Sequence, residues 1–349
     1  MIGCSLNHAR GLNMQQVETR LYQNQLRHDF DLDEIGMIYH LPLPRLLKIA
    51  QTIHSENWSD EEVQLCTLLS IKTGGCKENC SYCPQSAHHT TKVNSHGLLE
   101  VDEIKKAAQT AKDAGSTRFC MGAAWRAAPK SGPAFDQIVE TVKEVSGLGL
   151  EVCMTLGLLT EDQAHKLKDA GVYAYNHNID SSREYYEKVI STRTFDDRLE
   201  TLRNVRKSGM TVCCGGIVGM GEEITDRIKF LKELNTMNPH PESVPINMLI
   251  KVEGTPLENA EDLDIFDLIR TIATARIIMP KSRVRLSAGR KQMSDETQAM
   301  AFMAGANSIF TGDKLLTTEN PNIDDDKKLL SRLGMRSVTK VEKVGHARF

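Results

Sequence analysis

The sequence has no apolar run long enough to span a membrane, and its formal net charge is only −3 over 349 residues. A membrane helix needs about 20 mostly apolar residues in succession, and nucleic-acid-binding domains concentrate positive charge on one face. Residues 1–20 also lack the apolar core of a secretory signal. We therefore expect a cytoplasmic protein with neither a membrane partner nor a nucleic-acid partner.

The chain contains nine cysteines, an odd number. Thiols stay reduced in the cytosol, so clustered cysteines there indicate metal binding rather than disulfides. Hydrophobic residues make up 40% of the chain and charged residues 26%, which is typical of a globular protein. The length suits two average domains or one (β/α)8 barrel.

A fourth cysteine is missing from the densest group of thiols. Cys76, Cys80 and Cys83 follow one another at spacings of three and two intervening residues, directly after Thr73-Gly74-Gly75. Closed structural zinc sites usually recruit four ligands, whereas three thiolates on a glycine-rich loop suit a [4Fe–4S] cluster with one iron open to another ligand. Three unrelated reduced cysteines and an incomplete zinc site are the alternatives.

From Val63 onward, candidate strands alternate with amphipathic helical segments, which predicts parallel βαβ units. The candidate strands are Gln64–Lys72, Thr117–Gly122, Glu151–Leu156, Val172–Asn178, Thr211–Val218, Ser243–Ile250, Arg283–Ser287 and Asn307–Phe310. The candidate helices are Val101–Ala114, Phe135–Val145, Glu161–Ala170, Phe195–Lys207, Asp226–Leu234, Leu263–Ile278 and Asp295–Ala304, with a last one near Asp325–Leu333.

This count predicts an α/β fold, a (β/α)8 barrel of the TIM type with an N-terminal helical extension, and a doubly wound open sheet is the competing fold. The expected boundaries are 1–60 for the extension, 61–320 for the barrel and 321–349 for a C-terminal tail. Residues 1–30 show no periodicity and are expected to be loose, and an apolar stripe from Leu41 to Ile53 predicts a capping helix.

Strand parity predicts a polar barrel interior, because successive residues of a strand face opposite sides. In several strands the apolar residues share one parity, which belongs under the helices. The opposite, inward parity includes Arg118, Cys120, Cys153, Cys213, Asn247 and Arg285. Three thiols and one further donor suffice for a [2Fe–2S] cluster with a non-cysteine ligand. The residues alone assign Arg285 to an anion or to the charge of the cluster, because a guanidinium group stays protonated.

Parity also separates two adjacent cysteines. Val212 is β-branched and suits the helix-facing surface of the barrel, and Gly215 suits a face where a ligand approaches the backbone closely. Both observations place Cys213 inside the barrel and Cys214 outside it.

The Cys-x3-Cys-x2-Cys spacing, with Tyr82 before the last cysteine, resembles the signature of the radical S-adenosylmethionine (SAM) enzymes. Further stretches between about Leu65 and about Thr318 resemble the biotin synthase family within that superfamily. These stretches are Ser70–Gly74, Tyr82–Ser86, Arg118–Trp125, Tyr175–Asn178, Gly215–Gly219, Val244–Leu249 and Val284–Arg290.

The resemblance implies a dimeric barrel, a transferase of biotin biosynthesis that carries two clusters. The [4Fe–4S] cluster that binds SAM would be held by Cys76, Cys80 and Cys83. The [2Fe–2S] cluster would be held by Cys120, Cys153, Cys213 and Arg285, so the resemblance makes the arginine a ligand. Dethiobiotin would lie between SAM and the second cluster, which donates the sulfur, and a small electron-donor protein of the flavodoxin or ferredoxin type would be a partner.

Contacts to the two small molecules follow from the same resemblance. Cofactor contacts are expected from Tyr82, Asn178, Asp180, Arg198 and Gly216. Substrate contacts are expected from Asn178, Asn247, Thr317 and Thr318. Each type of residue also has an ordinary structural explanation: Asn and Asp after a strand form turns, a lone helical arginine is usually solvated, and glycine-rich loops also serve as turns.

Three other functions compete with this interpretation. A ferredoxin-like electron carrier needs a fourth ligand on its cluster and no barrel, and a zinc-stabilised binding module would be colourless. Another radical SAM enzyme of cofactor or metallocluster maturation would share the first thiol group. The second thiol set with Arg285 argues against that third alternative.

Overall fold

The computed structural model describes residues 26–339. The first 25 residues of the predicted loose extension and the last ten residues of the predicted tail lie outside this part. None of the helices within it is both long and apolar enough to cross a membrane.

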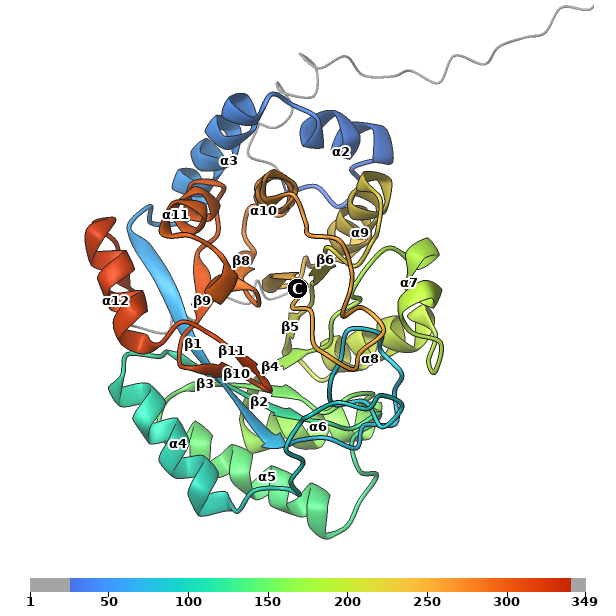
Figure 1. The fold of residues 1–349 in the computed structure, drawn as a ribbon. Coiled ribbons are helices and arrows are strands. Elements are labelled where there is room, and N and C mark those ends of the chain that lie inside the picture. Colours follow the sequence, from blue (N-terminus) through green and yellow to red (C-terminus); the bar gives the residue numbers. More distant parts are fainter. Residues whose placement is uncertain (1–25, 340–349) are drawn as a thin grey trace, which may run out of the picture.

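Eight parallel strands close into a barrel, which confirms the predicted TIM-type fold and excludes the open sheet (Figure 1). In spatial order the strands are β1 (Glu62–Lys72), β2 (Arg118–Ala123), β3 (Glu151–Thr155), β4 (Val172–Asn176), β5 (Thr211–Cys213), β7 (Ser243–Met248), β8 (Arg283–Leu286) and β9 (Ser308–Phe310). The pairing of β9 with β1 closes the ring.

Helices surround the ring of strands (Figure 1). They are α4 (Val101–Asp113), α5 (Pro133–Ser146), α6 (Glu161–Ala170), α8 (Phe195–Lys207), α9 (Ile224–Thr236), α10 (Ile265–Ile278), α11 (Asp295–Met303) and α12 (Ile323–Arg332), with a short α7 (Arg183–Val189) before α8 and a 3-10 turn η1 (Arg290–Gln292) before α11. Several begin with strong local signals. Thr160 and Gln163 form a reciprocal capping box at α6, and Thr194 and Asp197 form one at α8.

Two N-terminal helices, α2 (Leu32–Tyr39) and α3 (Leu43–Asn57), pack against α10 on the outside of the helical ring (Figure 1). A capping box between Asp31 and Glu34 starts α2. Helix α10 is therefore enclosed between the barrel and this outer layer. That position explains why it is buried almost continuously from Leu268 to Ile278.

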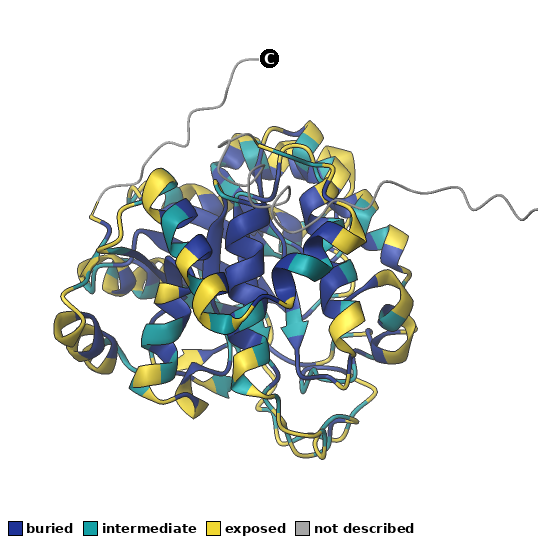
Figure 2. Cartoon of the chain, turned by 90° about the horizontal axis from the view of Figure 1, so that it is seen from above, coloured by how far each residue is buried: buried dark blue, intermediate teal, exposed yellow. Residues whose placement is uncertain are grey.

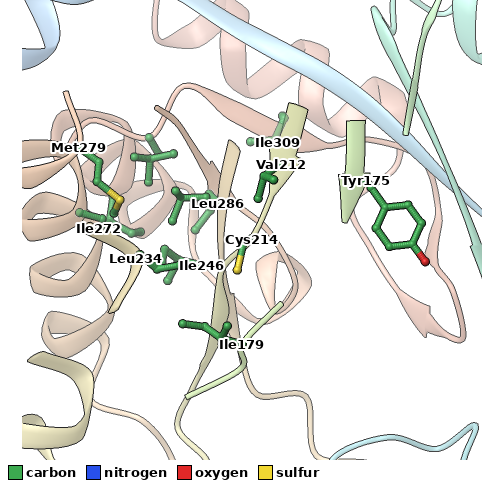
Figure 3. Packing of buried hydrophobic residues seen from close by; sticks show 14 of the residues in the cluster. Tyr175, Ile179, Val212, Cys214, Leu234, Ile246, Ile272, Met279, Leu286 and Ile309 are labelled. Carbon is green, nitrogen blue, oxygen red and sulfur yellow. The ribbon is translucent and has the colours of Figure 1, made fainter. Parts of the chain in front are cut away.

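The apolar residues form two separate cores, one on each face of the strands. The larger core lies between strands and helices, and Figure 2 shows buried residues gathered in the interior with exposed ones on the outer helical faces. Cys214 belongs to this larger core, beside Val212, Ile246 and Leu286 (Figure 3). The smaller core lies inside the barrel and consists of Cys66, Cys120, Cys153, Ala174, Cys213, Phe310 and Leu315.

The predicted strand Thr211–Val218 is interrupted in the structure. It divides into β5 and β6 (Gly216–Val218), and both pair with β7. A Cβ atom on Gly215 would lie 2.0 Å from the carbonyl oxygen of Pro245 in β7. Our interpretation of Gly215 as a point of ligand approach is therefore wrong: a neighbouring strand, not a ligand, requires the glycine.

We expect Gly215→Ala to destabilise the barrel strongly, because β5 and β7 would have to separate to make room for the methyl group. Overpacking costs about 1–3 kcal/mol and occasionally more, and we expect a loss near the top of that range. Anaerobic thermal unfolding of both proteins would measure it. Gly97→Ala is the control, because Gly97 is exposed and no atom lies within 4 Å of the point that the added methyl group would occupy. Equal midpoints for the two variants would contradict the expectation.

Three short elements after β9 were not predicted. A hairpin of β10 (Lys314–Leu315) and β11 (Thr318–Glu319) follows β9, and β12 (Arg336–Ser337) adds to β1 in parallel beyond α12. Strands of two residues leave no periodic pattern in a sequence, so only the folded chain identifies them.

Candidate functional site

A cavity of about 330 Å³ opens at the carboxyl ends of the barrel strands. Enzyme sites of this fold lie at that end, where the strand-to-helix loops meet. Both thiol groups line the cavity, which therefore joins Cys76, Cys80 and Cys83 to Cys120, Cys153, Cys213 and Arg285. These two groups were predicted separately, from loop spacing and from strand parity, and the fold brings them to one space.

The loop between β1 and α4 holds the first three thiols. The backbone N–H of Cys76 donates to the Gln85 carbonyl at 3.0 Å, and the N–H of Ala87 donates to the Cys76 carbonyl at 2.7 Å. The N–H of Cys83 donates to the Cys80 carbonyl at 2.9 Å. This local pairing closes the loop on itself and turns the three cysteines toward the cavity.

Two of these thiols are poor acids without a cation nearby. Burial raises the pKa of Cys80, and burial together with the charge of Cys80 raises the pKa of Cys83 to about 12. Both are therefore protonated at neutral pH in the protein alone. Metal ions bind the thiolate, so occupation of this site must release protons and reverse these shifts.

The second thiol set lies deeper, inside the barrel. Cys120 and Cys153 are register neighbours on β2 and β3, and Cys213 lies at the end of β5. Hydrogen bonds from the Cys153 thiol to Cys120 and Cys213 raise the pKa of Cys153 well above its usual value. The same bond lowers the pKa of Cys213 well below its usual value, with a further contribution from the charge of Arg285.

Arg285 reaches these thiols from β8. Its Nε donates to Ser308 Oγ at 3.0 Å, and its Nη1 lies 3.8 Å from Cys213 Sγ. Burial opposes its charge, but the neighbouring cysteines more than compensate and raise its pKa. In this structure the arginine is a cation beside the thiols, which is the role that the residues alone predicted.

Asp180 and Arg198 form a buried ion pair at the rim of the cavity, with 2.6 Å between Oδ2 and Nη2. The Tyr82 hydroxyl also donates to Asp180 Oδ2, at 2.8 Å, and so ties the cysteine loop to the end of β4. Arg198 is buried and donates to the Tyr186 hydroxyl at 2.7 Å. The alternative that Arg198 lies on a solvated helical face is therefore excluded.

Asn178 Oδ1 accepts from the N–H of Gly215 at 3.1 Å and from the Asn176 side chain at 3.0 Å. Asn247 is held similarly: its Nδ2 donates to the Gly216 carbonyl at 2.9 Å, and its Oδ1 accepts from the N–H of Ala288 at 3.2 Å. Both amides line the cavity with their remaining hydrogen-bonding capacity.

Two of the expected contacts are backbone or hairpin positions. A Cβ atom on Gly216 would lie 2.4 Å from the Asp180 carbonyl, so glycine lets β6 approach the end of β4. Thr317 and Thr318 line the cavity from the β10–β11 hairpin. The Thr318 hydroxyl donates to the Leu315 carbonyl at 3.3 Å.

Several cavity-facing residues were missed from the sequence. Cys66 is on the inward parity of β1, so the parity argument would have found it had it been applied to that strand. Asn176, His177 and Arg193 also line the cavity, and no motif marks them. Burial lowers the pKa of His177 well below its usual value, so this ring is neutral.

The side chains present fit two iron–sulfur clusters and a polar cofactor. Within residues 26–339, no three His, Cys, Asp or Glu side chains surround a single ion position. The thiols must therefore be judged against clusters, whose irons are spread over several ångströms. His177 Nε2 and Arg193 Nη1 line the cavity, are buried and have no hydrogen-bond partner in the described part of the chain. Such atoms are costly unless a ligand satisfies them.

Two family models match the chain. The radical SAM superfamily matches residues 70–234, and the Biotin and Thiamin Synthesis associated domain matches residues 245–336. Together they cover the barrel from the end of β1 to the start of β12.

Curated relatives match nearly the whole chain. Biotin synthases of Marinobacter nauticus and Hahella chejuensis are each 56% identical to it, over 89% and 90% of this chain and 88% of each relative. The biotin synthase of Cellvibrio japonicus is 57% identical over 89% of this chain and 86% of that protein.

Among solved structures, methylornithine synthase superposes with a TM-score of 0.76 at 22% identity, covering 92% of this chain and 97% of that one. A maturase of the [FeFe]-hydrogenase superposes with a TM-score of 0.78 at 15% identity, covering 93% of this chain and 75% of that one. At these identities the likeness shows the shared fold alone.

The closed barrel with three loop cysteines at its carboxyl end defines a radical SAM enzyme. The chain belongs to the biotin synthase family. It is thus an enzyme that converts dethiobiotin to biotin by radical SAM sulfur insertion and uses SAM, a [4Fe–4S] cluster and a [2Fe–2S] cluster.

Proposed function

We propose that the two thiol groups of the cavity hold the two clusters. The [4Fe–4S] ligands are Cys76, Cys80 and Cys83. The [2Fe–2S] ligands are Cys120, Cys153, Cys213 and Arg285. The observation that carries this assignment is that one cavity is lined by both groups, with the space between them left for two small molecules.

The bound groups supply the radical chemistry: an electron from the first cluster cleaves SAM, the resulting 5′-deoxyadenosyl radical removes hydrogens from dethiobiotin, and a sulfide of the second cluster is the inserted atom. The chain's own task is to position the reactants and to exclude water. The second thiol set lies on barrel strands and is almost fully buried. The rigid backbone therefore fixes its distance from whatever is bound at the rim.

We assign the rim residues to SAM. Arg198 is placed to bind the methionine carboxylate, and it is kept charged by Asp180. The unpartnered Arg193 Nη1 supplies a second cationic donor nearby. Tyr82 holds the cysteine loop against Asp180, and Gly216 lets the backbone approach the adenosine moiety.

We assign the amides and the hairpin to dethiobiotin. Asn178 and Asn247 each retain donors that face the cavity, and a cyclic urea needs both donors and acceptors. Asn178 is shared between cofactor and substrate. Thr317 and Thr318, on the β10–β11 hairpin, are placed to hold the substrate carboxylate.

The partners follow from the chemistry. Reductive cleavage of SAM requires an external electron, so we propose a small flavodoxin- or ferredoxin-type donor protein that docks near the cysteine loop. We further propose a cytoplasmic homodimer, in keeping with the family resemblance. Size-exclusion chromatography with light scattering would measure the oligomeric state.

Anaerobic reconstitution with iron and sulfide tests the function. The reconstituted protein is incubated with SAM, a reductant and dethiobiotin, and biotin is identified by mass spectrometry. A brown protein that forms biotin and 5′-deoxyadenosine supports the proposal. A colourless protein would favour zinc, and 5′-deoxyadenosine without biotin would favour another radical SAM reaction.

Replacement of Asn178 by alanine is expected to weaken the binding of both SAM and dethiobiotin. The change removes an amide shared by two ligands and leaves the N–H of Gly215 without its acceptor, at a cost of about 1–3 kcal/mol. Equilibrium binding of each ligand, with the other present and absent, measures the effect.

Asn204→Ala is the matched control for this prediction. Its side chain donates to the Leu159 carbonyl at 2.9 Å, and neither residue lines the cavity. It should lose stability without losing ligand affinity. Unchanged affinities in Asn178→Ala would mean that this residue serves only the turn after β4.

A further inference from the structure

A fourth thiol, Cys66, belongs to the group inside the barrel. It is fully buried and packs in the inner core with Cys120, Cys153 and Cys213. These cysteines come from β1, β2, β3 and β5 respectively. Four strands therefore each bring one thiol to the same interior, whereas three thiols and Arg285 complete the proposed ligand set.

Cys66 and Arg285 are in direct contact. Arg285 Nη2 donates to Cys66 Sγ at 3.3 Å, while Nη1 of the same group lies 3.8 Å from Cys213 Sγ. The guanidinium is thus located between the fourth thiol and the proposed cluster ligands. If the arginine side chain were absent, no other side chain named in these contacts would separate Cys66 from the cluster site.

The ligand preferences of iron make this arrangement informative. Iron–sulfur clusters are held mainly by thiolates, and a guanidinium group must give up a proton before it can donate an electron pair. A thiol is therefore the better fourth ligand, yet the structure places the arginine in front of it.

We propose that Cys66 is a reserve ligand of the second cluster, one that binds iron when the Arg285 side chain leaves its place. The inference rests on the assignment of the second cluster made above. The exchange is balanced without an outside reagent: Cys66 gives up its thiol proton as its sulfur binds iron, and the departing arginine nitrogen takes up one proton as its bond to iron breaks. Because sulfur insertion removes a bridging sulfide from this cluster, a second donor would keep the irons held while that bridge is missing.

The simpler explanation is that Cys66 only makes hydrogen bonds. Its sulfur also lies 3.5 Å from Ser308 Oγ and 3.6 Å from Gln64 Oε1. Serine in place of cysteine keeps the size and the hydrogen bonding but not the thiolate. Cys66→Ser therefore separates the two explanations better than alanine does.

The experiment compares reconstituted Arg285→Ala, Cys66→Ser, the double variant Arg285→Ala/Cys66→Ser and the control Arg285→Ala/Cys214→Ser. Cys214 is equally buried but lies in the outer core. Iron and sulfide contents are determined, and Mössbauer and visible spectra are recorded, all independently of turnover.

We expect both single variants and the Cys214 control to keep about six irons per chain, and the Arg285→Ala/Cys66→Ser variant to fall to about four, the content of the first cluster alone. The spectra of Arg285→Ala should change in the manner of a nitrogen ligand replaced by a thiolate, and Cys66→Ser should resemble the unmodified protein. Loss of the second cluster in Arg285→Ala alone, or its retention in the Arg285→Ala/Cys66→Ser variant, would overturn the proposal.

Cys153→Ala distinguishes this failure from failure of the cluster assignment itself. If Cys153→Ala loses the second cluster while the Arg285→Ala/Cys66→Ser variant keeps it, the reserve ligand is wrong and the assignment stands. If Cys153→Ala also keeps the cluster, the assignment of the second thiol set is wrong.

Discussion

Replacing any one of Cys76, Cys80 or Cys83 with alanine is expected to abolish the reductive cleavage of SAM. Three thiolates leave one iron of a [4Fe–4S] cluster open to the cofactor, and with two thiolates the cluster is neither held nor open at a defined iron. Even outer-shell partners of metal ligands cost about 10–100-fold when removed, so we expect a loss of more than about 100-fold for a ligand. Formation of 5′-deoxyadenosine under anaerobic reducing conditions measures it.

Lys77→Ala is the control on the same loop, because Lys77 is exposed and lies between two of the cysteines. It should cleave SAM at a rate close to that of the unmodified protein. Undiminished 5′-deoxyadenosine formation by any one of the three cysteine variants would refute the ligand assignment for that cysteine.

The adjacent cysteines Cys213 and Cys214 are expected to behave oppositely. Cys213→Ala should lose the [2Fe–2S] cluster and all biotin formation while keeping the [4Fe–4S] cluster, since its sulfur lies inside the barrel with Cys153 and Arg285. Cys214→Ala should keep both clusters and biotin formation. Its sulfur packs in the outer core (Figure 3), so its removal costs only a small cavity, about 1 kcal/mol.

Iron and sulfide analysis with Mössbauer spectroscopy of the two variants decides this prediction, and thermal unfolding measures the stability term. The reverse pattern would mean that the register of β5 is shifted by one residue. Such a shift would turn every inward side chain of that strand to the other face.

Spacing and parity were sufficient to predict much of the candidate site. The loop cysteines announce themselves by proximity along the chain. Cys120, Cys153 and Cys213 follow from the two-residue period of strands, because each alternates with apolar residues that must lie under helices. The structure agrees with this separation, since the thiols and the residues between them belong to different cores.

Other parts of the site depend on contacts between distant segments. Gly215 is required by the carbonyl of Pro245, about thirty residues away, and a sequence-based ligand explanation for it was wrong. Arg198 resembles any helical arginine until Asp180 is found beside it. Cys66 gains its significance only from the Arg285 side chain, which reaches it from the opposite end of the chain.

The sequence by itself determined the alternation of strands and helices, the first thiol group and the inward parity of the second, because spacing and periodicity are local properties of a chain. Only the tertiary structure decided that β9 pairs with β1, that the two thiol groups share one cavity, and that a fourth thiol stands behind Arg285. The physical reason is that barrel closure sets distances between residues far apart in sequence, and no local pattern encodes those distances.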